Sequence, residues 1–289
     1  MPAMNALKTL ALLTAGLLSA NAALAAEPLA DPSRLVTIGG SVTEIVYALG
    51  AGDEIVGRDT TSTFPPEAND LPDVGYMRQL SPEGVLSVSP TAIISIEGAG
   101  PPETIDVLKK ADLDFAEVPE AYSRDGIIEK VKTIGTLIGR KTEAEALAAD
   151  IAADLDPILA ANEARTEKKR AIFILSLRGG KVMGSGTGTA ANGVIEAAGL
   201  ENAIGDFPGY KALSDEAVIE AAPDIILVMG GAAGGHSLSN DDMAGQPALA
   251  LTPAVQNGAI YHIDPVGMMN FGPRFADNLK TLTDEIYGK

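Results

Sequence analysis

An internal repeat is the feature that most constrains how this chain can fold. The segment LSPEGVL at 80–86 recurs as LSDEAVI at 213–219, an offset of 133 residues. Across 80–98 and 213–231, seven positions are identical, where average composition gives roughly one or two by chance. A duplicated unit of this kind predicts two related lobes that face each other across a cleft.

Short apolar runs bounded by glycine and proline alternate with amphipathic stretches along the chain. The run at 35–38 is followed by Gly39 and Gly40 and then by a helical pattern at 41–49 that ends at Gly50. This order predicts a strand, a turn and a capped helix with a glycine stop. The alternation predicts an α/β fold with parallel sheets covered on both faces. Further strands are expected at 92–96, 114–118, 171–177, 225–229 and 259–263.

Residues 141–169 differ in composition from the chain on either side. They are rich in Ala, Glu, Leu and Lys, contain no glycine and have Pro157 as their one proline. Such a segment predicts a long helix, and about 20 residues at about 1.5 Å each span roughly 30 Å, enough to join two lobes. An ordinary surface helix of one larger domain is the alternative. The expected organisation is a signal peptide at 1–25, an N-terminal lobe at 26–140, a connecting helix at 141–168 and a C-terminal lobe at 169–289.

The first residues have the pattern of an export signal. Lys8 is the only charge before an apolar run at 9–18, and the small residues around Ala23 and Ala25 follow, where a signal peptidase cuts. The apolar run is well short of the roughly 20 residues of a membrane-spanning helix, which is the alternative interpretation. We therefore expect export to the periplasm and a mature chain that begins near Ala26.

The cysteine count and the charge narrow the expected partners. The chain has no cysteine, so it has no disulfides and no acceptor for the lipid that tethers many exported binding proteins. We expect a protein without a membrane anchor, retained by the second membrane of a Gram-negative type of envelope. The formal charge is −18, and without Lys8 of the signal peptide 20 basic residues face 39 acidic ones. Nucleic acid is therefore not an expected partner.

The signatures of hydrolases and metal enzymes are missing from the sequence. It has no Gly-x-Ser-x-Gly elbow and no cysteine nucleophile. Its two histidines, His236 and His262, are too few and too far apart for a dedicated zinc site. The glycine-rich stretch at 184–189 lacks the ending of a phosphate loop, which favours a turn into a helix. These observations favour a binding protein over an enzyme.

Tyr76 is the most suggestive single residue. Gly75 leaves room beside it, and Arg78 lies two residues on, which in an extended chain places both side chains on one face. A guanidinium beside a phenol favours the phenolate, a hard anionic ligand suited to ferric iron and known for haem iron. A cleft-lining tyrosine whose arginine holds a carboxylate is the alternative. Tyr210, which corresponds to Tyr76 just upstream of the repeat with a shift of one residue, and Tyr122, in a predicted loop, are weaker candidates to reach the cleft.

Each repeat also carries a glutamate early in a predicted helix. Ser81 and Ser214 are placed as N-caps, and Glu83 and Glu216 follow at the second helical position. Interaction with the helix dipole, worth some tenths of a kcal/mol, is enough to explain either acid. The same acid at the same place on both lobes also suits docking onto two basic groups of a transporter.

Further motifs complete the pattern, and together they are fairly specific. They are DTTS at 59–62 with Phe-Pro at 64–65, LPDVGYMR at 71–78, GTAA at 188–191, GYK at 209–211 and FGPR at 271–274. With the repeat, they resemble the periplasmic haem-binding proteins of haemin ABC importers, within the wider group that carries siderophores and cobalamin. The resemblance covers nearly all of the expected mature chain.

This resemblance implies two Rossmann-like lobes joined by a single long helix, with the ligand cleft between them and little hinge closure. It implies that Tyr76 is the axial ligand of the haem iron, supported by Arg78. It also implies that Glu83 and Glu216 engage arginines of the permease. The expected cargo is ferric haem, and the expected partners are an inner-membrane ABC permease and its ATPase.

The sequence departs from the resembled family at one place. Some members carry a second axial histidine just after the strand that here ends at 174–178, and this chain has none there. We therefore expect ligation by tyrosine alone, with Arg178 as a candidate partner of a haem propionate or else a plain surface arginine. A ferric-siderophore or cobalamin carrier is the alternative function. A periplasmic enzyme or haem-trafficking factor is the third.

Overall fold

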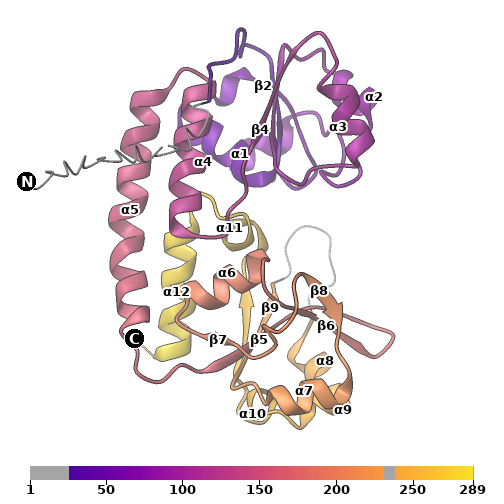
Figure 1. The fold of residues 1–289 in the computed structure, drawn as a ribbon, viewed down its shortest axis with the longest axis vertical. Coiled ribbons are helices and arrows are strands. Elements are labelled where there is room, and N and C mark those ends of the chain that lie inside the picture. The colour runs from indigo at the N-terminus through magenta and orange to yellow at the C-terminus, as the bar shows by residue number, and fades with distance from the viewer. Residues whose placement is uncertain (1–25, 231–237, 289) are drawn as a thin grey trace, which may run out of the picture.

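The structure is a computed structural model, which describes residues 26–230 and 238–288. The expected signal peptide at 1–25 lies outside these residues. Two separate sheets build two lobes, one above the other in Figure 1. We call the part built on the four-stranded sheet the N-terminal lobe and the part built on the six-stranded sheet the C-terminal lobe.

The N-terminal lobe contains the elements β1 (Leu35–Ile38), α1 (Gly40–Ala48), η1 (Gly52–Glu54), β2 (Ile55–Arg58), η2 (Pro66–Asp70), α2 (Pro82–Leu86), β3 (Ala92–Ile96), α3 (Pro102–Leu108), β4 (Asp114–Val118) and α4 (Arg124–Leu137). Its strands are all parallel, in the order β2-β1-β3-β4. The central strands β1 and β3 are buried along their whole length, as expected of a parallel sheet covered on both faces. The strands predicted for this lobe are confirmed.

The C-terminal lobe contains β5 (Arg170–Arg178), β6 (Lys181–Ser185), α6 (Ala190–Ala197), β7 (Glu201–Asn202), β8 (Tyr210–Ala212), α7 (Asp215–Ala221), β9 (Ile225–Met229), α8 (Asn240–Gly245), α9 (Pro247–Ala250), α10 (Pro253–Gln256), β10 (Ile260–Ile263), α11 (Pro265–Met269) and α12 (Phe275–Tyr287). The strand order is β10-β9-β5-β6-β8, with β7 beside β5. The expected turn at 184–189 is confirmed, because Thr189 caps α6 by accepting a hydrogen bond from Asn192 N at 3.0 Å.

The prediction of a parallel sheet is wrong for the C-terminal lobe, whose sheet is mixed. Strands β5 and β6 pair antiparallel, and β6 pairs antiparallel with β8. The cause is a two-residue turn at Gly179 and Gly180, whose φ angles of 58° and 78° lie in the left-handed region. Such a turn joins adjacent antiparallel strands directly, so no crossover helix separates them. The Gly-Gly pair was the sequence signal for this hairpin.

The first helix also differs from its prediction. Helix α1 begins without a side-chain cap, after Gly39 with φ 106°. The Gly39 N–H donates instead to the side chain of Asp59, from the loop after β2, at 2.9 Å. A partner from a distant loop thus replaces the local cap that the pattern predicted.

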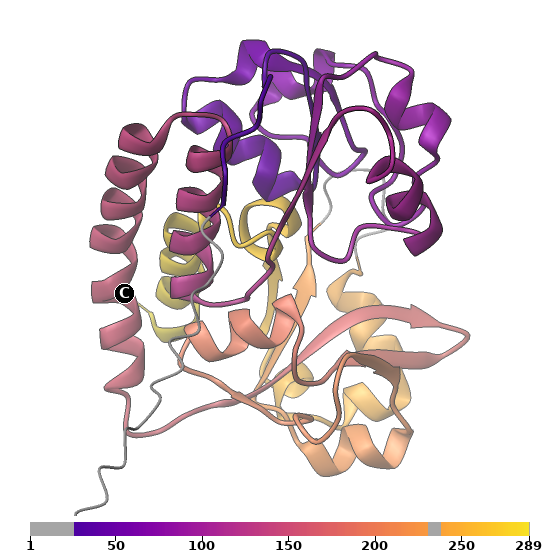
Figure 2. The same cartoon turned by 45° about the horizontal axis from the view of Figure 1, so that its top comes forward.

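A 23-residue helix, α5 (Lys141–Glu163), connects the two sheets in sequence and runs along one side of both lobes (Figures 1 and 2). It ends at Glu163 rather than at the predicted residue 168. It packs against α4 of the N-terminal lobe and against α12. The lobe boundaries at 26–140 and 169–289 remain predictions. Within the described residues, no helix is both long and apolar enough to cross a bilayer.

One apolar cluster runs through both lobes. It includes Leu35 of β1, Ile127 of α4, Leu155 of α5, Val194 of α6 and Leu279 of α12, all fully buried. Each lobe adds a smaller cluster of its own on the far side of its sheet. The junction between the lobes is therefore packed like a protein interior, which resists relative movement of the two sheets.

Candidate functional site

Tyr76 lies on the loop between η2 and α2 in the N-terminal lobe. Its side chain is 41% exposed, one of the few large apolar side chains that the lobe presents to solvent. Gly75 directly before it has φ 112°, a conformation that favours glycine. An exposed phenol on such a loop is free to meet a ligand, which a core tyrosine is not.

The prediction of an extended chain from Tyr76 to Arg78 is wrong. The chain from Tyr76 to Gln79 forms a turn, in which Gln79 N donates to Tyr76 O at 2.7 Å, and not an extended strand. A second segment closes the turn from outside, since Gly100 N donates to Met77 O at 2.8 Å. Arg78 is exposed at this turn, and within the described residues its guanidinium has no ion-pair partner within 4.0 Å.

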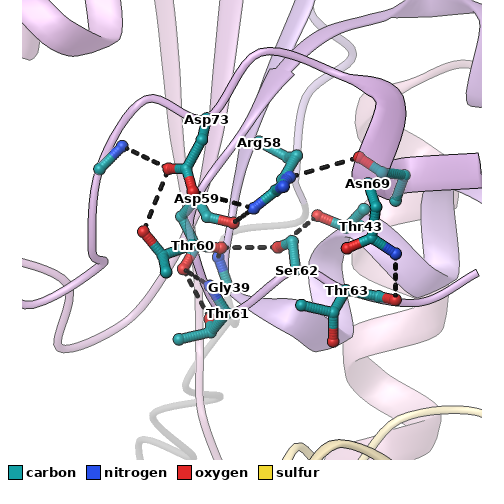
Figure 3. Close-up of polar contacts among 12 residues, drawn as sticks. Gly39, Thr43, Arg58, Asp59, Thr60, Thr61, Ser62, Thr63, Asn69 and Asp73 are labelled. Atoms are coloured by element: carbon teal, nitrogen blue, oxygen red, sulfur yellow. Dashed lines mark hydrogen bonds and ion pairs between the residues drawn. The ribbon is translucent and has the colours of Figure 1, made fainter. Parts of the chain in front are cut away.

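A buried carboxylate, that of Asp59, organises the loop after β2 (Figure 3). Asp59 is fully buried. Its Oδ1 accepts from Gly39 N at 2.9 Å and Ser62 Oγ at 2.6 Å. Its Oδ2 accepts from the N–H and the hydroxyl of Thr61, at 2.9 and 2.6 Å. Ser62 Oγ also accepts from Thr43 Oγ1 at 2.7 Å, so one acid ties the loop after β2 to the start of α1.

Tyr210 begins β8, at the edge of the C-terminal sheet, and is 39% exposed. Tyr122 lies where the chain leaves the N-terminal sheet for α4, and its ring packs on Phe271 of the C-terminal lobe with centroids 5.5 Å apart. Burial raises the pKa of the Tyr122 phenol, as does the Glu120 carboxylate, whereas the Arg78 guanidinium lowers it and the Tyr210 phenol raises it. Groups from both lobes therefore lie within electrostatic reach of Tyr122.

The two repeat glutamates stand where their sequence places them. Ser81 Oγ accepts from Gly84 N at 3.1 Å and Ser214 Oγ accepts from Ala217 N at 3.2 Å, which confirms both N-caps. Glu83 on α2 and Glu216 on α7 are exposed. Hydrogen bonds from its own backbone N–H and from the Ser214 hydroxyl hold the pKa of Glu216 below its ordinary value. In Figure 1, α2 and α7 belong to different lobes and lie away from α5.

The remaining candidates contribute less. Arg178 ends β5, and its side chain lies outside the described residues, as does the whole of His236. His262 lies on β10, exposed, with its Nε2 3.2 Å from Asn240 Oδ1. Within the described residues, no three acidic or histidine side chains gather to form a metal site.

Sequence reasoning missed a polar seam between the lobes. Lys130 of α4 is fully buried and donates to Glu120 Oε1 at 2.5 Å, to Ser41 Oγ at 3.3 Å, and to the carbonyls of Asn270 and Phe271 at 3.2 and 3.4 Å. Burial lowers the pKa of this amino group, and the Glu120 carboxylate opposes that shift. A lysine in an amphipathic helix pattern gives no signal that it is buried.

A second ion pair crosses the same seam. Glu44 of α1 accepts from the backbone N–H, Nε and Nη2 of Arg274 at 3.2, 3.1 and 3.0 Å. The guanidinium also lies over the Phe64 ring, 3.6 Å from its centroid. The motifs at 64–65 and 271–274 thus contact each other, although they are about 200 residues apart in sequence.

The chain is similar to several known proteins. The family described as periplasmic binding protein matches residues 35–266. The solved structure of the periplasmic heme-binding protein RhuT from Roseiflexus sp. RS-1, in apo form, is 34% identical, with a TM-score of 0.82, and the match covers 89% of this chain and 98% of that one. An uncharacterized ABC transporter substrate-binding lipoprotein of Bacillus subtilis is 27% identical over 262 residues, 89% of this chain and 81% of the relative.

A cobalamin-binding protein of Halobacterium salinarum is 27% identical over 249 residues, and the match spans 83% of this chain but 64% of that protein. All these matches agree on the fold. The names of the matched proteins give different ligands, heme for one and cobalamin for another.

Proposed function

The chain belongs to the periplasmic binding protein family, and on that premise we propose that it binds ferric haem between its two lobes and delivers it to an inner-membrane ABC permease. Its relatives are binding proteins for transport, so the chain is a binding protein of the haem, cobalamin and siderophore group and not an enzyme. Its two-lobed α/β fold is the fold of these proteins.

The observation that carries the haem proposal is the exposed phenol of Tyr76 on a loop with a fixed backbone. Ferric iron is a hard cation, and a tyrosine oxygen is one of the protein ligands that haem iron takes. Arg78 next to it supplies a positive charge for a propionate. Tyr210, on the other lobe, is also exposed, and its ring offers apolar surface to a porphyrin. Arg178, at the end of β5, stays a candidate for a second propionate.

Delivery would use the two exposed glutamates. Glu83 and Glu216 occupy matching positions on α2 and α7, one on each lobe. Two acids at a fixed separation suit two basic groups on a symmetric permease, because a rigid carrier satisfies both ion pairs at once. The test is stimulation of permease ATPase activity by the purified protein, which should fall when Glu83 and Glu216 are both changed to alanine while hemin binding stays intact.

Cobalamin is the second candidate, because a cobalamin-binding protein matches most of the chain. Cobalamin already carries its own axial groups, so its binding does not need the Tyr76 hydroxyl. A ferric siderophore saturates its iron in the same way. The three cargoes therefore differ in how much their affinity depends on one phenol oxygen.

A titration of the purified mature protein separates these candidates. Hemin should produce a Soret band near ~400 nm with saturable binding, and Tyr76→Phe should abolish the tyrosinate character of that spectrum. Tyr261→Phe, on β10, is the matched control and should leave the spectrum unchanged. Binding of cyanocobalamin in preference to hemin would overturn the haem proposal, and an identical hemin spectrum in Tyr76→Phe would overturn the role of Tyr76 as the iron ligand.

A further inference from the structure

The backbone on the N-terminal side of Tyr76 is held by one carboxylate. Gly75 N donates to Asp73 Oδ1 at 2.9 Å. The carbonyl of the same glycine accepts from Thr60 N at 3.0 Å. Both hydrogen-bonding groups of Gly75 are thus occupied, and the residue that precedes the phenol has little freedom to rotate.

The Asp73 carboxylate is itself fixed by three donors. Its Oδ1 accepts from Thr60 Oγ1 at 3.1 Å as well as from Gly75 N. Its Oδ2 accepts from Arg58 Nη1 at 3.1 Å. The Arg58 side chain is 10% exposed and the Asp73 side chain 41%, so the acid sits at the boundary between the interior and solvent. The bond from Arg58 is charge-assisted, and such bonds are stronger than neutral ones.

The donors come from the end of β2 and from the loop that follows it. Arg58 ends β2, and its N–H and carbonyl pair with Pro72 O at 3.0 Å and Val74 N at 2.9 Å. Thr60 belongs to the loop that the buried Asp59 ties to Gly39 (Figure 3). A continuous chain of hydrogen bonds therefore runs from the end of the parallel sheet to the residue before Tyr76.

Steric crowding does not explain this arrangement. A Cβ built on Gly75 would meet nothing within 4 Å, so the glycine is needed for its φ of 112° and not for space. The groups that hydrogen-bond to the Gly75 backbone are the Asp73 carboxylate and the Thr60 N–H.

We propose that Asp73 is the positioning residue for Tyr76: its carboxylate holds Gly75 in the left-handed conformation that presents the phenol to the ligand. The expected effect on binding rests on the proposed haem function. A Tyr76 phenol that is already fixed avoids the entropy that is lost when a mobile loop becomes ordered on haem binding. Asp73 does not touch the iron. It acts through the backbone of Gly75.

The first measurement needs no ligand. Hydrogen exchange of the Gly75 amide, followed by NMR, should be clearly faster in Asp73→Ala than in the unchanged protein, and intermediate in Asp73→Asn, which keeps an acceptor oxygen but loses the charge. Asp112→Ala, at an exposed site outside the network, is the control. We call the hold of the Asp73 carboxylate on Gly75 the Asp73 clamp, and an unchanged exchange rate at Gly75 in Asp73→Ala overturns it.

The second measurement is a hemin titration of four proteins: the unchanged chain, Asp73→Ala, Tyr76→Phe and the double variant. Asp73→Ala should weaken hemin binding by about tenfold, the effect of losing one or two hydrogen bonds. In the Tyr76→Phe background the same change should have less than about a twofold effect. An equal loss in both backgrounds means a merely structural role and overturns the inference.

The two proposals fail in different ways. If the unchanged protein does not bind hemin, the haem function is overturned, and the Gly75 exchange rate still decides whether Asp73 fixes the segment. If Tyr76→Phe alone loses hemin while Asp73→Ala binds like the unchanged protein, the haem function stands and the positioning role of Asp73 is wrong.

Discussion

The Gly75-Tyr76 segment of the N-terminal lobe and the Gly209-Tyr210 segment of the C-terminal lobe correspond just upstream of the repeat, with a shift of one residue, yet different chemistry holds them. Gly75 is fixed by the Asp73 carboxylate. Gly209 is fixed by main chain alone, since its N–H donates to Thr187 O at 2.9 Å and its carbonyl accepts from Gly186 N at 2.8 Å. The two tyrosines are almost equally exposed, at 41% and 39%.

The residue two places before the glycine explains the difference. It is Asp73 in the first copy and Phe207 in the second. Phe207 contributes its carbonyl, which accepts from Thr187 N at 2.8 Å, while its ring lies 4.0 Å from Lys211 Nζ. Ladder pairing tolerates many side chains, whereas a carboxylate clamp depends on one. On the proposed haem function, the N-terminal copy would place its tyrosine precisely and the C-terminal copy would supply apolar contact.

The largest expected effect concerns the seam that holds the two lobes together. Lys130→Met should lower the free energy of unfolding by about 3 kcal/mol or more, because Glu120 is left buried without its cation. Chemical denaturation measures this. Lys132→Met, exposed on the same helix, should change stability by less than about 0.5 kcal/mol. Equal effects of the two changes would show that the seam does not join the lobes energetically.

The loss of one polar side chain should destabilise the N-terminal lobe more than the C-terminal lobe. Asp59→Ala should cost about 3 kcal/mol, because four donors from three residues lose a buried acceptor. Thr189→Ala, which removes the cap of α6 in the C-terminal lobe, should cost about 1 kcal/mol. Thermal unfolding of both variants ranks them, and a larger loss for Thr189→Ala would contradict the comparison.

The tyrosines themselves should separate by function. Tyr76→Ala should weaken hemin binding by about 100-fold or more, since even groups that only support a metal ligand are worth roughly 10- to 100-fold. Tyr210→Ala removes apolar contact but no iron ligand, and should weaken binding by less than about tenfold. Isothermal titration with hemin gives both values. A larger loss for Tyr210→Ala would indicate that Tyr210, and not Tyr76, is the iron ligand.

The smallest effect concerns how α5 is attached to each lobe. Toward the N-terminal lobe, Arg124 of α4 donates to both oxygens of Asp156 at 2.8 and 2.9 Å. Toward the C-terminal lobe, the buried amide of Asn162 donates to Ala197 O at 2.9 Å. Hydrogen bonds from the Arg124 guanidinium lower the pKa of Asp156. The stability that the first attachment contributes therefore depends on pH, whereas that of the second does not.

The sign of that dependence follows from the direction of the shift. A carboxyl whose pKa is lower in the folded state stabilises the fold above its ordinary pKa, and this stabilisation is lost as the pH falls through the lowered value. Arg124→Ala should therefore lower the melting temperature slightly at pH 7 and not below about pH 3. Asn162→Ala should cost about 1 kcal/mol at both pH values. Melting curves at the two pH values check this.

Much of the fold could be read from local pattern. The predicted strands at 35–38, 92–96, 114–118 and 225–229 match the structure residue for residue. Both serine caps and the start of α5 at Lys141 also follow from the sequence. These features depend on neighbours within a few positions along the chain, so the order of residues is enough to specify them.

The sequence by itself determined the repeat, its capped helices and the places of Tyr76, Tyr210, Glu83 and Glu216. Only the tertiary structure decided which of these segments are fixed by hydrogen bonds, and which residues supply those bonds. Each of the three networks includes bonds between distant residues, 20 positions apart for Asp59 and Gly39, 13 for Asp73 and Thr60, and 141 for Lys130 and Phe271, and the turn at Tyr76 is closed by Gly100 from another loop. Such bonds form only when packing brings distant segments together, and no local periodicity records which polar side chain will then be buried.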